Sequence, residues 1–125
     1  INGSSGIGTG WSTDIPPFNP KDILKNIKLH FAGIEMEEMY PYYRNFKGSI
    51  YKRGNNFYSK GIYSAKNDVI TIKELPIGVW SDKYKEYLEG LIIDSKAKSS
   101  KQIIRYYNSY CSDVDVHFEI TMDQN

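Results

Sequence analysis

Few residues of this chain have the types and the spacing that catalysis requires. The two histidines, His30 and His117, lie on different predicted elements, and neither has a serine, cysteine or acid partner at a recognisable spacing. Each fits a surface role better than acid–base chemistry, which needs a partner within hydrogen-bond reach. Asp113 and Asp115 would share one face of a strand and could approach a divalent cation together, but no third ligand is evident. We therefore predict no catalytic residue and no metal site.

The glycine-rich start of the chain suggests a nucleotide site, but its surroundings exclude one. The run Gly6-x-Gly8-x-Gly10 would need a strand before it and a helix opening at its third glycine to bind a dinucleotide. Only two residues precede Gly3, and Ile15-Pro16-Pro17 intervenes before any predicted helix. The segment is therefore interpreted as an extended ribbon whose backbone can lie close against another surface, because glycine has no Cβ.

Ile7 is the one branched apolar side chain within this ribbon, and little apolar bulk surrounds it in the sequence. One interpretation is a small hydrophobic anchor inside a glycine-rich turn. The other is an apolar wedge of the kind that inserts between the base steps of a DNA duplex. The residues alone leave both interpretations open.

Composition limits the chain to a few classes of protein. Its 125 residues suffice for one domain, and a single cysteine, Cys111, excludes an internal disulfide framework and fits a reducing compartment. No apolar run reaches the roughly 18 residues of a membrane span. The sequence begins at Ile1 rather than Met, so we expect a piece of a longer protein.

The charges are separated by sign along the chain, although the net charge is only +1. Residues 39–67 and 95–112 contain basic side chains and no acid. This distribution suits a domain that offers one positive face to phosphates. A solvated surface with uneven charge is the alternative, and composition by itself favours it slightly.

The periodicity predicts an α+β fold in which helices flank a mainly antiparallel sheet. Asn19-Pro20 begins a helix that ends at Gly33; Ile23, Leu24, Ile27 and Phe31 form its core face, and Lys21, Lys25 and Lys28 lie opposite. Three strands are predicted as a meander over 48–53, 57–64 and 69–74, the last of them central, followed by a helix after Ser81 that carries Tyr84, Tyr87, Leu88 and Leu91. A third helix is predicted over 100–110, and a final half-buried strand over 114–122.

The opening motif, Asn2-Gly3-Ser4-x-Gly6-Ile7-Gly8-Thr9-Gly10-Trp11-Ser12 with Ile15-Pro16, resembles type IIA DNA topoisomerases in their eukaryotic and large-DNA-virus form. Further blocks continue the resemblance in order: Phe18-Asn19-Pro20, Tyr43 to Ile50, Ile72 to Trp80, Tyr84-Lys85-Glu86 and Val116 to Ile120. Two departures affect surface detail. Ile77-Gly78-Val79 replaces the more usual Val-x-Thr, and Tyr51-Lys52 stands where relatives often carry an acid.

The resemblance implies a role in DNA binding and bending. It makes residues 1–18 the glycine-rich wedge segment and connector from the winged-helix region, and residues 19–125 a tower-like domain. Ile7 would intercalate between base pairs of double-stranded DNA. The residues expected to contact the DNA backbone are Gly6, Gly8, Thr9, Arg44, Lys47, Lys52 and Arg53. Trp11 is expected to pack and stiffen the ribbon.

The whole enzyme implied by the resemblance is an ATP-dependent homodimer that passes one duplex through a transient break in another, using Mg²⁺ and a tyrosine nucleophile. Those parts, including the tyrosine, are expected outside this chain, which by itself would be inactive and could be monomeric. The expected location is the nucleus, or the host cell for a viral source. A non-enzymatic DNA-architectural module and a protein-interaction domain are the alternative functions.

Overall fold

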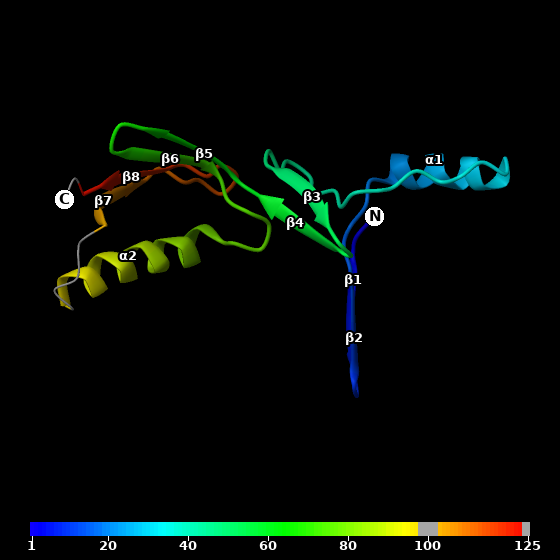
Figure 1. The fold of residues 1–125 in the computed structure, drawn as a ribbon, viewed down its shortest axis with the longest axis horizontal. Helices are drawn as coiled ribbons and strands as arrows, with labels where there is room; N and C mark the ends of the chain where they lie inside the picture. The colour runs from blue at the N-terminus through cyan, green and yellow to red at the C-terminus, as the bar shows by residue number, and fades with distance from the viewer. Residues whose placement is uncertain (98–102, 124–125) are drawn as a thin grey trace. The chain divides into compact units, whose positions relative to one another are not determined.

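A computed structural model describes residues 1–97 and 103–123, which divide into two compact units (Figure 1). Unit 1 contains residues 1–45 and 50–58, and unit 2 contains residues 46–49 and 59–125. Among the described residues, no helix is both long and apolar enough to span a bilayer. The predicted α+β class is confirmed, with elements in the order β1 (Ser4–Gly8), β2 (Trp11–Ile15), α1 (Pro20–Phe31), β3 (Ser49–Arg53), β4 (Asn56–Lys60), β5 (Ile62–Lys66), β6 (Val69–Glu74), α2 (Ser81–Ala97), β7 (Ile104–Ser109) and β8 (Phe118–Met122).

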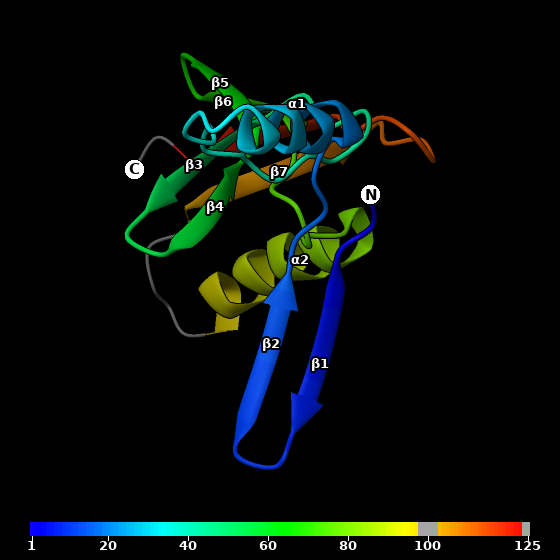
Figure 2. The same ribbon diagram turned by 90° about the vertical axis from the view of Figure 1, so that its right-hand side faces the viewer.

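The glycine-rich ribbon forms a β-hairpin, which the sequence did not predict. β1 and β2 pair antiparallel (Figure 2), and the register places Ile7 opposite Ser12 and Gly8 opposite Trp11. The connecting turn includes Gly10, whose φ of 82° favours glycine. Glycine has a low strand propensity, so the local sequence gives little sign of this pairing.

The first helix begins and ends where its capping residues predict. The Asn19 side chain accepts a hydrogen bond from the Lys21 N–H at 3.0 Å, and Pro20 occupies the first turn, where its missing N–H costs nothing. Gly33 follows the helix with φ 69°, the left-handed conformation common after a helix C-terminus.

The predicted core face of α1 is largely exposed. Leu24, Ile27 and Phe31 are 53%, 46% and 85% exposed, whereas the buried residue of the helix is the polar Asn26. Its side-chain amide donates to the Glu37 carbonyl at 2.7 Å and accepts from the Glu37 N–H at 2.9 Å. The expectation of a core face was wrong for the described residues, because these three apolar side chains stay about half exposed or more.

The predicted meander divides into two hairpins. β3 pairs with β4, and β5 with β6, and the break falls at Gly61. A Cβ at Gly61 would lie 2.1 Å from the Glu74 carbonyl oxygen, so the chain turns where only glycine fits. The continuous strand predicted over 57–64 was therefore wrong.

Unit 2 is a four-stranded antiparallel sheet, ordered β5-β6-β8-β7, with α2 along one face (Figure 1). The expectation that Val69 to Ile72 would be central is confirmed, since β6 has a neighbour on each side. The core between helix and sheet consists of Leu75, Leu88, Ile104, Phe118 and Ile120.

The helix predicted over 100–110 was wrong: residues 104–109 form strand β7, and residues 100–102 lie outside the described residues. Ile104 is buried and Tyr107 packs against the core, three residues apart, which is helical spacing. An irregularity in the β7–β8 register between Ile104 and Tyr106 produces this spacing, because a bulge shifts the alternation by one residue.

The final strand is shorter than predicted. β8 begins at Phe118, whereas Val114 is 85% exposed. The residues before β8 form a loop, in which the Ser112 N–H donates to the Asp115 carbonyl at 2.9 Å. The apolar–polar alternation of residues 114–117 predicted a strand, but these residues precede β8 and belong to no named strand of the sheet.

Candidate nucleic-acid interface

The β1–β2 hairpin is anchored at its base by backbone hydrogen bonds. The Ile1 amino group donates to the Phe18 carbonyl at 2.8 Å, and the Phe18 N–H donates to the Ile1 carbonyl at 3.2 Å. The Tyr42 N–H donates to the Pro17 carbonyl at 2.8 Å. These bonds fix the two ends of the hairpin within unit 1 and leave its turn end unattached.

Ile7 lies near that turn with almost its whole side chain in solvent. It is 93% exposed, and its cross-strand partner is Ser12. Alternation along the strands places Ser5 and Asp14 on the same face, so no apolar side chain of the hairpin can cover it. Burying such a side chain requires another surface. A small hydrophobic anchor inside a glycine-rich turn, one of the two interpretations open from sequence, is excluded for the described residues, because Ile7 is not buried.

Trp11 lies on the opposite face of the hairpin, over Gly8. A Cβ built on Gly8 would lie 2.5 Å from the Trp11 indole nitrogen, so the ring occupies the space that a side chain would need. Gly6 has no neighbouring atom within 4 Å of its built Cβ. Of the two glycines expected to allow close approach, Gly6 is therefore open, whereas Gly8 accommodates the tryptophan. Thr9, in the turn, is exposed.

Two of the four cations predicted to contact DNA are paired with carboxylates. The Lys47 ammonium lies 3.0 Å from an Asp115 carboxylate oxygen, with both side chains more than half exposed. Lys52 pairs with Glu38. The hydrogen bond from Lys52 lowers the pKa of Glu38, and the same bond raises the pKa of Lys52. The Lys52–Glu38 pair therefore stays charged at neutral pH.

The other two cations, Arg44 and Arg53, are exposed and make no ion pair with any carboxylate in the part of the chain that the structure describes. Consecutive residues of a strand point to opposite faces, so Lys52 and Arg53 cannot act on one surface of β3. Both were among the cations predicted from sequence to contact the DNA backbone, and the strand places them on opposite faces.

One face of the β3–β4 hairpin carries Arg53. The same face carries two tyrosines that were not among the predicted site residues. The rings of Tyr51 and Tyr58 stack with centroids 5.6 Å apart and an interplanar angle of 18°. They are 48% and 44% exposed. The sequence could have indicated this arrangement, because Tyr51 and Arg53 are two residues apart and therefore lie on the same face of a strand.

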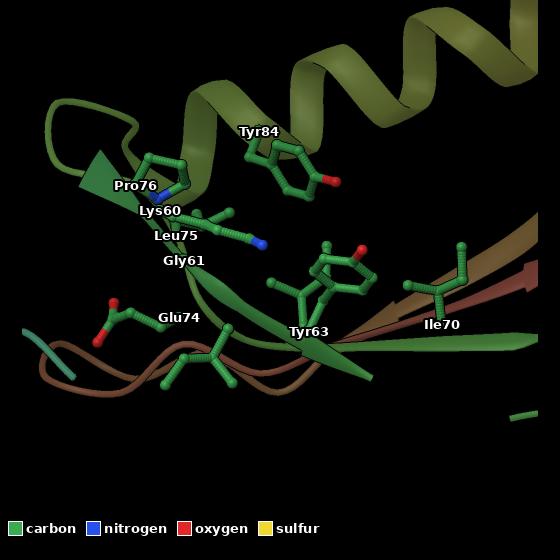
Figure 3. A pocket seen from close by; sticks show the side chains of 10 residues that line it. Lys60, Gly61, Tyr63, Ile70, Glu74, Leu75, Pro76 and Tyr84 are labelled. Atoms are coloured by element: carbon green, nitrogen blue, oxygen red, sulfur yellow. The ribbon is translucent and has the colours of Figure 1, made fainter. Parts of the chain in front are cut away.

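Unit 2 contains an apolar pocket of about 340 Å³ between β5, β6 and the first turn of α2 (Figure 3). Tyr63 and Tyr84 face each other across it, and burial raises the pKa of Tyr84. Lys60 and Glu74 lie at one end, but a Glu74 carboxylate oxygen already accepts the Lys47 N–H at 3.2 Å. The lining includes neither histidine nor cysteine.

The histidines and aspartates considered in the sequence analysis do not come together in one site among the described residues. Nε2 of His117 lies 3.4 Å from Glu119, and the His117 ring packs edge-on against Tyr110. His30 is exposed on α1. Asp115 lies in the loop before β8 and is paired with Lys47. No cluster of three or more histidine, cysteine or acidic side chains suited to a metal occurs within residues 1–97 and 103–123.

A family model for the A-type chain of DNA gyrase/topoisomerase IV matches residues 1–125. This chain belongs to that family. Within the DNA gyrase/topoisomerase IV family, it is similar to DNA topoisomerase 2 of Penicillium chrysogenum, with 39% identity over 126 residues that cover 99% of this chain and 8% of that protein. DNA topoisomerase 2 of Acanthamoeba polyphaga mimivirus is 39% identical over 104 residues, 82% of this chain and 8% of that protein.

The fold agrees with a solved structure of the same family. A crystal structure of the Plasmodium falciparum topoisomerase II DNA-binding, cleavage and re-ligation domain matches with a TM-score of 0.88 and 42% identity, over 98% of this chain and 17% of that chain. The present chain thus spans less than a tenth of the length of the two curated relatives named above.

Proposed function

We propose that this chain is the part of a type IIA topoisomerase that binds and bends duplex DNA, with Ile7 as the intercalating side chain. The observation that carries the proposal is the 93% exposure of Ile7 on a hairpin face without apolar neighbours. Unstacking a base step costs a few kcal/mol, which a bent duplex offsets through wider backbone contact. The resemblance of the fold to a DNA-binding, cleavage and re-ligation domain supports this role.

Residues 1–18 act in this proposal as the wedge and connector from the winged-helix region, and residues 19–125 as the tower-like domain. This division is functional. It differs from the two compact units, because the β1–β2 hairpin and α1 belong to the same unit.

Backbone contacts would come from Gly6, Gly8 and Thr9 beside the wedge, and from the exposed cations. Arg44 and Arg53 can bind phosphate directly. Lys47 and Lys52 would first exchange a carboxylate for a phosphate. Exposed ion pairs contribute only about 0–1 kcal/mol, so this exchange costs little.

The longer protein would be a homodimeric, ATP-dependent enzyme that acts on double-stranded DNA in the nucleus, or in the host cell if it is viral. Cleavage would use Mg²⁺ and a tyrosine supplied from elsewhere in that protein. The described residues contain no acidic cluster suited to a metal. In this proposal the steps that involve Mg²⁺ and ATP belong to the other parts of that protein.

An Ile7→Ala substitution in the full-length enzyme tests the proposal. We expect a smaller DNA bend by fluorescence resonance energy transfer, and cleavage reduced by about tenfold for each 1.4 kcal/mol of lost stabilisation. Ile15→Ala is the matched control, because Ile15 is an exposed aliphatic residue at the other end of the same hairpin. An unchanged bend angle in Ile7→Ala would contradict the proposal.

Assays on the longer protein separate the enzymatic function from a purely architectural one. Relaxation and decatenation of DNA are expected from a topoisomerase. A protein that bends DNA through Ile7 but neither relaxes nor decatenates it would instead be an architectural module. Absent or salt-insensitive DNA binding would favour a protein-interaction domain.

A further inference from the structure

The β3–β4 hairpin presents a stacked pair of tyrosine rings beside the exposed guanidinium of Arg53. Tyr51 and Tyr58 come from the two strands, and their rings stack at 5.6 Å. This contact shows that both side chains lie on the same side of the hairpin. Nearly half of each tyrosine stays exposed, so part of the aromatic surface is free for a ligand.

Strand alternation assigns further residues to this side, and two of them lie next to the turn. Arg53 follows Tyr51 by two positions, and Asn56 precedes Tyr58 by two, so the four side chains share one surface. We call these residues, Tyr51, Arg53, Asn56 and Tyr58, the tyrosine face. All of them are exposed, and Arg53 has no ion-pair partner among the described residues.

The opposite side of the hairpin contacts the segment after α1, within unit 1. Phe57 packs edge-on against the Tyr40 ring at 5.8 Å, and Lys52 pairs with Glu38. The turn between the strands contains Gly54, whose φ of 62° suits the first position of a two-residue hairpin turn. One face of the hairpin is therefore packed within unit 1, and the tyrosine face is exposed to solvent.

The composition of this face indicates the kind of partner. Affinity for duplex DNA comes mainly from cations that neutralise phosphates, and a duplex keeps its base faces inside the stack. The tyrosine face combines two rings with one cation, Arg53, and the same alternation places the exposed Lys60, two positions after Tyr58 in β4, on this side of the strand as well. Surfaces that bind single strands combine positive charge with aromatic rings on which exposed bases stack. The surrounding segment, residues 39–67, contains no acid that would repel a phosphate.

We propose that the tyrosine face binds single-stranded nucleic acid, with a base stacked on the Tyr51–Tyr58 pair and Arg53 on the adjoining phosphate. The Asn56 amide can both donate to and accept from a base edge. This contact is separate from the Ile7 wedge and goes beyond duplex bending. It would hold an unpaired stretch of the DNA on which the enzyme acts.

Fluorescence anisotropy of a labelled oligothymidylate strand, which forms no internal base pairs, tests this contact in the 125-residue chain. The Tyr51→Leu/Tyr58→Leu variant keeps apolar strand residues but removes the rings, and we expect about tenfold weaker binding. The Tyr51→Phe/Tyr58→Phe variant keeps the rings and should bind like the unmodified chain. Amide hydrogen exchange in β3 and β4 checks that each variant keeps the hairpin.

A second pair of variants tests the charge. Arg53→Gln should weaken binding and make the dependence of the binding constant on salt less steep, because one phosphate contact is lost. Lys66→Gln makes the same change in net charge at the exposed end of β5, outside the tyrosine face, and should change little. Equal losses in these two variants would show that net charge alone binds the strand, and would overturn the proposal.

Two further outcomes would also overturn it. Equal losses for the Phe and Leu variants would mean that the tyrosine hydroxyls, not the rings, make the contact. An effect of the Leu variant on a labelled duplex as large as that on oligothymidylate would mean that the face binds duplex backbone. Ile7→Ala should leave oligothymidylate binding unchanged, so failure of the wedge and failure of the tyrosine face are distinguishable.

Discussion

At the scale of single residues, two glycines of the same motif have different roles. A side chain at Gly6 would enter open space, whereas a side chain at Gly8 would overlap the Trp11 ring. The motif itself predicts close approach at both positions, because it shows only that Cβ is absent. The space beside Gly8 is filled by the Trp11 ring because the strand register places these two residues opposite each other.

Gly8→Ala is expected to displace the Trp11 ring, and Gly6→Ala to leave it in place. The overlap at Gly8 should cost about 1–3 kcal/mol of hairpin stability, as overpacking does elsewhere. The chain has two tryptophans, so the measurement needs a Trp80→Phe background in which Trp11 is the only indole. We expect a shifted emission maximum and stronger acrylamide quenching for Gly8→Ala alone. Identical spectra for the two variants would contradict this assignment.

At the scale of elements, the sequence predicts what local chemistry determines. Asn19 and Pro20 place the start of α1 correctly, because capping depends on neighbouring residues alone. β7 was mistaken for a helix because its bulge gives Ile104 and Tyr107 helical spacing, and only the partner strand β8 reveals the difference. The exposed face of α1 was mistaken for core because its pattern matches an amphipathic helix whether or not a partner is present.

We expect the Asn26 side chain to fix the position of the segment after α1 through its two hydrogen bonds to Glu37. Asn26→Ala leaves the Glu37 N–H and carbonyl without their partners, at a cost of about 1–3 kcal/mol. Faster exchange of the Glu37 amide, by roughly tenfold or more, is the expected result in hydrogen-exchange NMR. Lys25→Ala removes only the exposed ion pair to Glu37, so it should change exchange far less. A larger effect from Lys25→Ala would show that the ion pair holds the segment.

At the scale of the whole chain, the family and the class of the candidate site follow from sequence, but the arrangement of the site does not. The exposure of Ile7 depends on the hairpin register, which gives it Ser12 as a neighbour. The pairing of Lys47 with Asp115 joins residues far apart in sequence, and no local pattern predicts it. The separation of Lys52 from Arg53 required only the strand alternation of β3, so the sequence already contained that information.

The core of unit 2 should lose stability at alkaline pH through Tyr84. Its ring packs edge-on against the buried Phe118 at 5.2 Å, and burial, with a smaller contribution from Tyr87, raises the pKa of Tyr84 above the usual 10.0. Above pH 10.0 the unfolded chain therefore binds fewer protons than the folded one, and the free energy of unfolding falls as pH rises. Below that pH the contribution of Tyr84 is fully present.

Urea unfolding followed by circular dichroism, repeated from neutral pH to well above 10.0, measures this dependence. Tyr84→Phe removes the titrating group and should flatten the alkaline fall. The fall should not vanish, because burial and a hydrogen bond to Glu89 also raise the pKa of Tyr107. Tyr63→Phe, on an exposed ring across the same pocket, is the matched control and should keep the original profile. If Tyr84→Phe and Tyr63→Phe show the same alkaline slope as the unmodified chain, the ionisation of Tyr84 does not cause the loss of stability at alkaline pH.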